Sequence, residues 1–149
     1  MAGPLAGLRV VEFAAIGPAP FGAMLLSDLG AEVLRIDRAD AAWPQMPIVS
    51  RGRSGLMLDL KSDAGRAQAM AAIDAADIVI EGLRPGVMER LGLGPETVCA
   101  RNERIIYARM TGWGQDGPRA QSAGHSSATF TRAAHRSSAC CSVRYAATP

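Results

Sequence analysis

The stretch LRVVEFAAIGPAPFGAMLLSDLGAEVLRI, residues 8–36, decides the fold class of this 149-residue chain. Leu8–Phe13 is rich in residues that favour β-strands, and the glycines and prolines of Ala14–Gly22 are typical of a turn. Ala31–Ile36 has the composition of a second strand. A strand, a turn, a helix and a second strand within so short a span indicate an α/β arrangement, in which the helix packs back onto the sheet.

The helix between these strands is predicted by the spacing of its apolar residues. Phe21, Leu25 and Leu29 recur at helical spacing, with Met24 beside them. Gly30 follows directly and is well placed to end the helix, because glycine readily adopts the left-handed conformation common at that position. The first unit is therefore a strand, a turn and a helix.

The chain repeats this alternation as far as its fifth predicted strand. We expect further strands at Gly55–Leu60, Asp77–Glu81 and Arg104–Met110, a helix capped by Ser62, and two short helices within Arg84–Asn102. Residues 41–54 contain two prolines and a glycine and are expected to form a surface loop. Five strands alternating with helices predict an α/β fold with a Rossmann-like parallel sheet and flanking helices.

Charge and hydropathy exclude two broad classes of function. The chain has 16 basic and 14 acidic side chains, but three of the arginines fall within residues 126–149, a segment without an acidic residue. Residues 1–125 therefore carry 13 basic and 14 acidic side chains and lack the basic stripe that nucleic-acid binding needs. The apolar runs are too short to cross a bilayer, and the N-terminus does not have the pattern of a secretory signal peptide. We expect a cytoplasmic protein that binds neither nucleic acid nor membranes.

The three cysteines, Cys99, Cys140 and Cys141, indicate free thiols in a reducing compartment. Adjacent cysteines without a second pair or a nearby group of histidines do not make a metal site. We expect no bound metal.

The composition changes sharply after His125. Residues 126–149 contain one Phe, one Val and one Tyr as their only large apolar residues. A segment so poor in large apolar side chains cannot bury enough surface to offset the entropy that it loses on ordering. We therefore divide the chain into a folded part, residues 1–125, and an unrelated tail, residues 126–149, that we expect to be disordered or appended.

The first glycine-containing turn does not match the known phosphate-binding motifs. Gly17 and Gly22 have the spacing of a P-loop, but Ala23 and Met24 occupy the positions where Lys and Ser or Thr are required. A dinucleotide fingerprint of the form GxGxxG is also absent, because Ala19 stands in place of its second glycine. The spacing favours a purely structural turn.

Three cations come at or just after the ends of predicted parallel strands. Arg38, Lys61 and Arg84 come after the second, third and fourth strands. The carboxyl ends of strands form the edge at which open α/β sheets bind ligands, and an arginine there can donate two hydrogen bonds to phosphate oxygens. The alternative for Arg38 is a solvated side chain paired with Asp37 or Asp40. Taken together, the cations favour one anionic ligand.

His125 is a candidate for proton transfer. It ends the glycine-punctuated stretch Thr111–His125, which follows the fifth strand at the same edge of the sheet, where loops commonly carry binding and catalytic groups. Histidine exchanges a proton readily near neutral pH, so His125 is a candidate base. The alternative is an ordinary surface histidine, since no Ser/His/Asp order, zinc spacing or Cys/His pair surrounds it.

Five segments of the sequence resemble segments of a known protein family. They are MAGPLAGLRVVEF (residues 1–13), GPAPFGAMLLSDLGAEVLRIDR (17–38), LMLDLKSDAGR (56–66), ADIVIEGLRPGVMERLGLGPE (76–96) and RIIYARMTGWGQDGPRAQSAGH (104–125). In this order they closely resemble the N-terminal part of the α-methylacyl-CoA racemases, within the family III CoA-transferase superfamily. The resemblance covers residues 1–125 almost continuously and implies an incomplete family III CoA-transferase fold.

The resemblance also implies roles for particular residues. The residues whose motifs match coenzyme A contacts are Arg38, Leu58, Asp59, Leu60, Lys61, Arg84 and Gly124. His125 stands at the place of the catalytic base, in the AGH motif. The implied substrate is a 2-methyl-branched acyl-CoA, and since coenzyme A is part of that substrate, no separate cofactor is implied. Full-length members form interlocked homodimers, an expectation that we do not extend to this shorter chain.

The implied reaction inverts the carbon next to the thioester carbonyl. One base removes the α-proton, the resulting enolate is stabilised, and the conjugate acid of a second base returns a proton on the opposite face. In the family the second acid/base is a carboxylate in a later GDF motif, which this sequence lacks. We therefore expect a truncated chain with little or no racemase activity, whose residues 126–149 derive from a shifted reading frame.

Two other functions remain open from the sequence. A CoA-transferase of the same superfamily would move CoA between carboxylic acids through an aspartyl thioester. The histidine of the AGH motif favours the racemase, because the transferases tend to have an aromatic residue there. The third alternative is a CoA-binding remnant without catalytic activity.

Overall fold

The structure is a computed structural model that describes residues 3–38, 47–122 and 140–144. Its elements in chain order are β1 (Arg9–Phe13), α1 (Pro18–Asp28), β2 (Glu32–Arg38), α2 (Pro47–Ser50), β3 (Arg53–Leu58), α3 (Asp63–Asp74), β4 (Ile78–Glu81), α4 (Val87–Arg90), α5 (Pro95–Arg101), β5 (Ile106–Thr111) and β6 (Cys140–Arg144).

The strands form one sheet in the order β3-β2-β1-β4-β5-β6. The first five strands in the chain are mutually parallel, and β6 pairs antiparallel with β5. This order confirms the predicted Rossmann-like sheet. The chain builds outward from β1 to β3 and then returns to place β4 on the other side of β1. Ligands bind in open α/β sheets at such a reversal, beyond the carboxyl ends of the strands.

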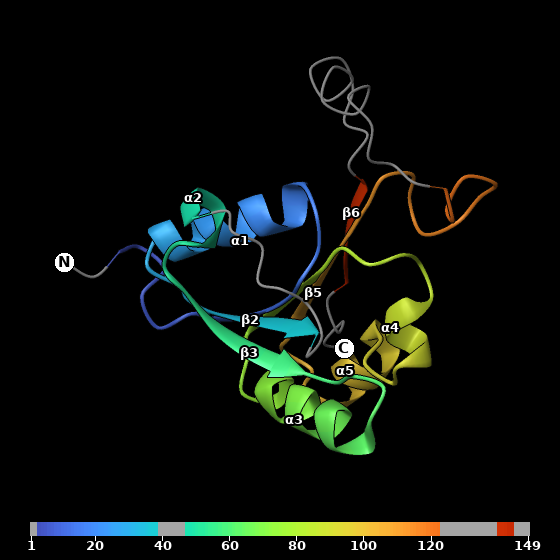
Figure 1. The fold of residues 1–149 in the computed structure, drawn as a ribbon, viewed down its shortest axis with the longest axis horizontal. Helices are drawn as coiled ribbons and strands as arrows, with labels where there is room; N and C mark the ends of the chain where they lie inside the picture. Colours follow the sequence, from blue (N-terminus) through green and yellow to red (C-terminus); the bar gives the residue numbers. More distant parts are fainter. Residues whose placement is uncertain (1–2, 39–46, 123–139, 145–149) are drawn as a thin grey trace, which may run out of the picture.

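Helices cover both faces of the sheet, as Figure 1 shows, with α1 and α2 on one face and α3, α4 and α5 on the other. The two faces have separate apolar cores, because neighbouring residues of a strand project in opposite directions. Val10 in β1 belongs to the core beneath α1. Val11 and Phe13 belong to the core beneath α3, which also contains Ala69 and Ile73. Apolar side chains buried on both faces are typical of a central parallel strand.

Helix α1 begins and ends at glycines with positive φ. Gly17 has φ 85° at the N-cap and is followed by a proline in the first turn. Gly30 has φ 101° just beyond the C-cap and confirms the predicted stop. Of the residues that predicted the helix, Met24 is buried, whereas Phe21, Leu25 and Leu29 are 43–53% exposed. The buried face carries smaller residues such as Ala19 and Ala23, which let the helix approach the sheet closely.

Three further features differ from the sequence-based expectation. A short helix, α2, lies within the segment that was expected to be an irregular loop. Strand β3 begins two residues earlier than predicted and ends at Leu58, so that Asp59–Lys61 form a turn. Strand β6 lies in the tail, for which no strand was expected. The helix capped by Ser62 is confirmed, since its hydroxyl accepts a hydrogen bond of 3.0 Å from the Gly65 N–H.

Within residues 3–38, 47–122 and 140–144, every helix is too short or too polar to cross a bilayer.

Candidate functional site

A cleft of about 690 Å³ opens at the carboxyl edge of the sheet. Its floor comes from the ends of β1, β2 and β3, and one wall comes from the segment after β4. The lining residues are Phe13, Ala14, Ile36, Asp37, Arg38, Leu58, Asp59, Leu60, Lys61, Leu83, Val87 and Leu91. The cleft therefore spans the reversal in strand order between β1 and β4, and its volume suits a small-molecule ligand.

The structure brings together five of the residues that the sequence analysis singled out. Arg38 and the run Leu58–Lys61 all line the cleft. Arg84 lies on the adjoining turn, exposed and outside the lining, although its neighbour Leu83 contributes to the wall. Gly124 and His125 lie outside the described residues. The placement of the two cleft cations supports the prediction of an anionic ligand.

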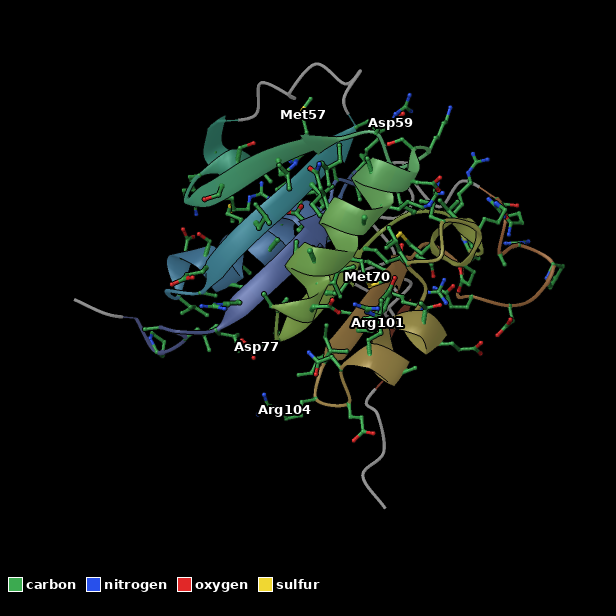
Figure 2. All side chains as sticks on the ribbon, turned by 90° about the horizontal axis from the view of Figure 1, so that it is seen from below. Met57, Asp59, Met70, Asp77, Arg101 and Arg104 are labelled. Carbon is green, nitrogen blue, oxygen red and sulfur yellow. The ribbon has the colours of Figure 1, made fainter. Side chains whose placement is uncertain are left out.

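The Asp59–Ser62 turn holds Lys61 at the mouth of the cleft. One Asp59 carboxylate oxygen accepts a hydrogen bond of 3.0 Å from the Lys61 N–H, and the Asp59 carbonyl accepts one of 2.8 Å from the Ser62 hydroxyl. This local pattern fixes the backbone of the turn. Figure 2 shows Asp59 at one end of the molecule and Arg104 at the other, so the turn belongs to the carboxyl edge. In the part of the chain that the structure describes, the Lys61 ammonium makes no ion pair.

Gly65 is required by this turn, and its replacement gives a first prediction. A Cβ atom at Gly65 would lie 2.0 Å from the Asp59 carbonyl oxygen, so a side chain forces the turn away from α3. We expect Gly65→Ala to lower the free energy of unfolding by about 1–3 kcal/mol, as measured by urea denaturation.

Gly22→Ala is the matched control for this prediction, because a Cβ atom at this position in α1 has open space around it. It is expected to raise stability by about 0.5–1 kcal/mol, since alanine favours a helix interior over glycine. Equal effects of the two substitutions would contradict the close approach of α3 to the Asp59 turn.

Asp37 is not the partner of Arg38, contrary to one alternative from the sequence. Its carboxylate accepts two hydrogen bonds from Arg35, at 2.8 and 3.1 Å, and both side chains are buried. Such a two-point pair has a fixed geometry. Asp40, the other suggested partner, lies outside the described residues. Arg35 therefore balances the charge of Asp37, and the other charged side chains of the lining are Arg38, Asp59 and Lys61.

Behind the wall after β4 lies a second buried carboxylate, Glu81. It accepts a hydrogen bond of 2.8 Å from the Leu83 N–H and one of 3.0 Å from Nε of Arg109. Burial raises the pKa of the Glu81 carboxyl, and the hydrogen bonds to Leu83 and Arg109 oppose this effect. Nearby, the buried Tyr107 hydroxyl donates a hydrogen bond of 2.9 Å to the Leu93 carbonyl. Burial also raises the pKa of Tyr107.

The glycine-punctuated stretch after β5 lies against the Arg84 turn. The Gln121 side-chain amide donates a hydrogen bond of 3.1 Å to the Pro85 carbonyl. Within the loop, the Arg119 guanidinium lies 5.3 Å from the centre of the Trp113 ring, a cation–π distance. The chain that leads toward residue 123 is therefore tied to the turn at the end of β4.

Of the apolar side chains in the lining, the sequence analysis singled out only Leu58 and Leu60. Phe13 is the last residue of β1, and Ile36 lies two residues before the end of β2; their alternation with polar residues carries no signal beyond that of a core residue. Leu83, Val87 and Leu91 follow the end of β4, as Arg84 does. Their position after that strand end was the one sequence signal that could have placed them in the lining. In the described residues, no group of three or more His, Cys, Asp or Glu side chains is placed to hold a metal ion.

The sheet order defines an α/β domain of the Rossmann type, with a cleft at the edge where such sheets bind ligands. Comparison with known proteins makes the assignment specific. Residues 5–136 match the family model described as CoA-transferase family III. The chain belongs to this family.

Individual relatives agree with the family assignment. The chain is 43% identical over 121 residues to the alpha-methylacyl-CoA racemase of Homo sapiens, a match that covers 81% of this chain and 31% of that protein. The crystal structure of Rv3272 from Mycobacterium tuberculosis matches with a TM-score of 0.77 at 37% identity, over 84% of this chain and 38% of that one. A CAIB/BAIF family protein from Brucella suis matches with a TM-score of 0.76 at 30% identity, over the same shares. The chain thus spans about a third of the length of these relatives.

Proposed function

We propose that the cleft binds the adenosine-phosphate end of coenzyme A, and that the chain is the CoA-binding part of an enzyme that racemises 2-methyl-branched acyl-CoA thioesters. The observation that carries this proposal is the convergence of Arg38 and Leu58–Lys61 on one cleft at the switch point of the sheet. These residues come from two different strand ends, and their motifs match the coenzyme A contacts of the family.

The cleft offers two kinds of surface, which match the two parts of this ligand. Arg38 and Lys61 supply charge at the mouth, where they are exposed and suit phosphate oxygens. Leu58, Leu83 and Leu91 supply apolar surface for the planar base. The polar groups therefore orient the ligand, while the apolar walls remove the base from water.

In the proposed reaction, coenzyme A enters as part of the substrate, and the thioester itself acidifies the α-proton. His125 is the proposed base for one face of that carbon, by its place in the AGH motif. Inversion needs a second acid/base on the opposite face and a hydrogen-bond donor for the enolate oxygen. The residues argued above bind and orient the CoA end, and none of them is assigned either role.

We therefore expect the 149-residue polypeptide to bind CoA but to exchange the α-proton little or not at all. The test uses a 2-methylacyl-CoA in deuterated water, with deuterium at C2 followed by NMR or mass spectrometry. Exchange at a rate typical of enzymes, with kcat near 1 per second or above, would contradict this expectation.

A CoA-transferase is the second candidate, because the relative in Mycobacterium tuberculosis is named a probable fatty acyl-CoA transferase. It would move CoA from one carboxylic acid to another without touching the α-proton. A labelled carboxylate acceptor distinguishes the two reactions. Transfer of CoA to the acceptor without deuterium at C2 favours the transferase, and binding without either reaction favours a CoA-binding module.

A further inference from the structure

The segment from Leu83 to Leu91 forms one wall of the cleft, and a buried ion pair lies directly behind it. Leu83, Val87 and Leu91 line the cleft. Glu81 at the end of β4 and Arg109 in β5 are opposite one another in the parallel register of the two strands. The Glu81 side chain is 1% exposed and that of Arg109 is 10% exposed.

The pair holds this wall at two points. Glu81 accepts the hydrogen bond from the Leu83 N–H at 2.8 Å, which fixes the backbone at the first lining residue after β4. Arg109 reaches the other way, and its Nη1 lies 2.8 Å from the Glu89 carboxylate in α4. One carboxylate and one guanidinium therefore connect the sheet to both the start of the wall and the helix that continues it.

Stability alone does not explain why charges occupy these two positions. A buried ion pair is often no more stabilising than an apolar pair of the same shape, because both charges lose their hydration. An apolar pair, however, would leave the Leu83 N–H without its acceptor and α4 without its link to β5. The particular contribution of the charged pair is therefore the position of the wall.

We propose that Glu81 and Arg109 are positioning residues for the cleft: they hold the wall in the geometry that binds CoA without contacting the ligand. The inference rests on the proposed function, because it assumes that CoA is the ligand. Binding surfaces need their lining side chains held within about half an ångström, and the hydrogen bonds to Leu83 and Glu89 supply that constraint.

The chain contains a matched control on the opposite face of the sheet. Glu12 in β1 and Arg53 in β3 form another ion pair, with both side chains 0% exposed. Arg53 also donates a hydrogen bond to the Val49 carbonyl, so this pair ties β1 to α2 and not to the cleft wall. Loss of either carboxylate disturbs a buried ion pair, but only Glu81 bonds to the wall.

The test compares Glu81→Gln with Glu12→Gln in the full chain. CoA affinity is measured by isothermal titration calorimetry, and exchange of individual amide protons is measured by NMR. Glu81→Gln is expected to weaken CoA binding about tenfold, the effect of losing one charge-assisted hydrogen bond. It is also expected to speed exchange of the Leu83 amide more than exchange of amides in β1. Glu12→Gln is expected to leave the CoA affinity within about twofold of the parent chain.

If Glu81→Gln does not fold, Glu89→Gln replaces it, because Glu89 is 45% exposed and its loss removes only the link to α4. That variant is expected to weaken CoA binding about threefold. Parental CoA affinity in the variant that folds, or an equal loss in Glu12→Gln, would overturn the inference. If the parent chain does not bind CoA, the proposed function fails. Amide exchange then tests by itself whether Glu81 and Arg109 hold the wall in position. Unchanged exchange of the Leu83 amide in Glu81→Gln, or of α4 amides in Glu89→Gln, then overturns the positioning role.

Discussion

Replacing both Arg38 and Lys61 by glutamine is expected to weaken CoA binding about a hundredfold. Each side chain lines the mouth of the cleft and is exposed, so each hydrogen bond to a phosphate gains less than a fully buried one would. A factor of about ten per cation corresponds to roughly 1.4 kcal/mol. The hundredfold figure takes the two effects as additive; because both cations would contact the same ligand, comparison with the single variants Arg38→Gln and Lys61→Gln measures any coupling between them.

The controls separate a local effect from a general loss of charge. Lys61→Arg keeps the positive charge and should retain most of the affinity. Arg104→Gln removes a cation at the opposite end of the molecule from Asp59 (Figure 2) and should have no effect on binding. The loss in the double variant should shrink as salt is added, because salt screens exposed charges. Equal losses in Arg104→Gln and Lys61→Gln would show that the cleft cations have no special role.

Replacing Arg53 by methionine is expected to lower the free energy of unfolding by about 3–5 kcal/mol. Arg53 donates a hydrogen bond to Glu12, and both side chains are fully buried between β1, β3 and α2. Without the guanidinium, the Glu12 carboxylate stays buried with no opposite charge in contact. The loss is a large fraction of the roughly 5–15 kcal/mol that stabilises an ordinary domain.

The pH dependence of this loss follows from the pKa of Glu12. Burial already raises the pKa of the Glu12 carboxyl, and the hydrogen bond and charge of Arg53 oppose that rise. Removing Arg53 therefore raises the pKa further. At pH values below the unfolded pKa the carboxyl is protonated in both states, and the variant should be close to the parent chain. As the pH rises toward and through the raised pKa of the variant, the defect should grow.

Urea denaturation at several pH values, on the parent chain, on Arg53→Met and on the double variant Glu12→Leu with Arg53→Met, measures both effects. The double variant should recover most of the lost stability, because an apolar pair replaces the unpaired charge. A defect that is the same at acidic and neutral pH, or a double variant less stable than the single one, would contradict this account of the buried pair.

The parallel fold could be predicted from the sequence because its signals are local. The β-forming residues of Leu8–Phe13, the glycines around α1 and the cap at Ser62 each act within a few residues of where they stand. Two elements were missed for the opposite reason. Helix α2 has only four residues, too few for a helical period, and β6 depends on pairing with β5, whose paired residues lie 29 to 37 positions earlier.

The residues of the candidate site likewise divide into those with a local sequence signal and those brought together only by the fold. Arg38 and Lys61 could be predicted because they lie close to strand ends, which converge at one edge: Arg38 is the last residue of β2, and Lys61 lies three residues after β3. The pairs Glu81–Arg109 and Glu12–Arg53 were not found, because each joins residues that only the strand register or the helix packing brings together. Sequence reasoning also offered Asp37 as a partner for Arg38, whereas the alternation of side chains along β2 puts Asp37 beside Arg35.

The most direct test of the account is an NMR titration of the ¹⁵N-labelled full chain with CoA. Amide shifts should concentrate at Arg38, at Leu58–Lys61 and at Leu83, with saturation at one equivalent of ligand. Amides near Arg104, at the opposite end of the sheet, should not move. Shifts that are absent, or that gather away from the carboxyl edge of β1, β2 and β3, would contradict the assignment of this cleft as the CoA site.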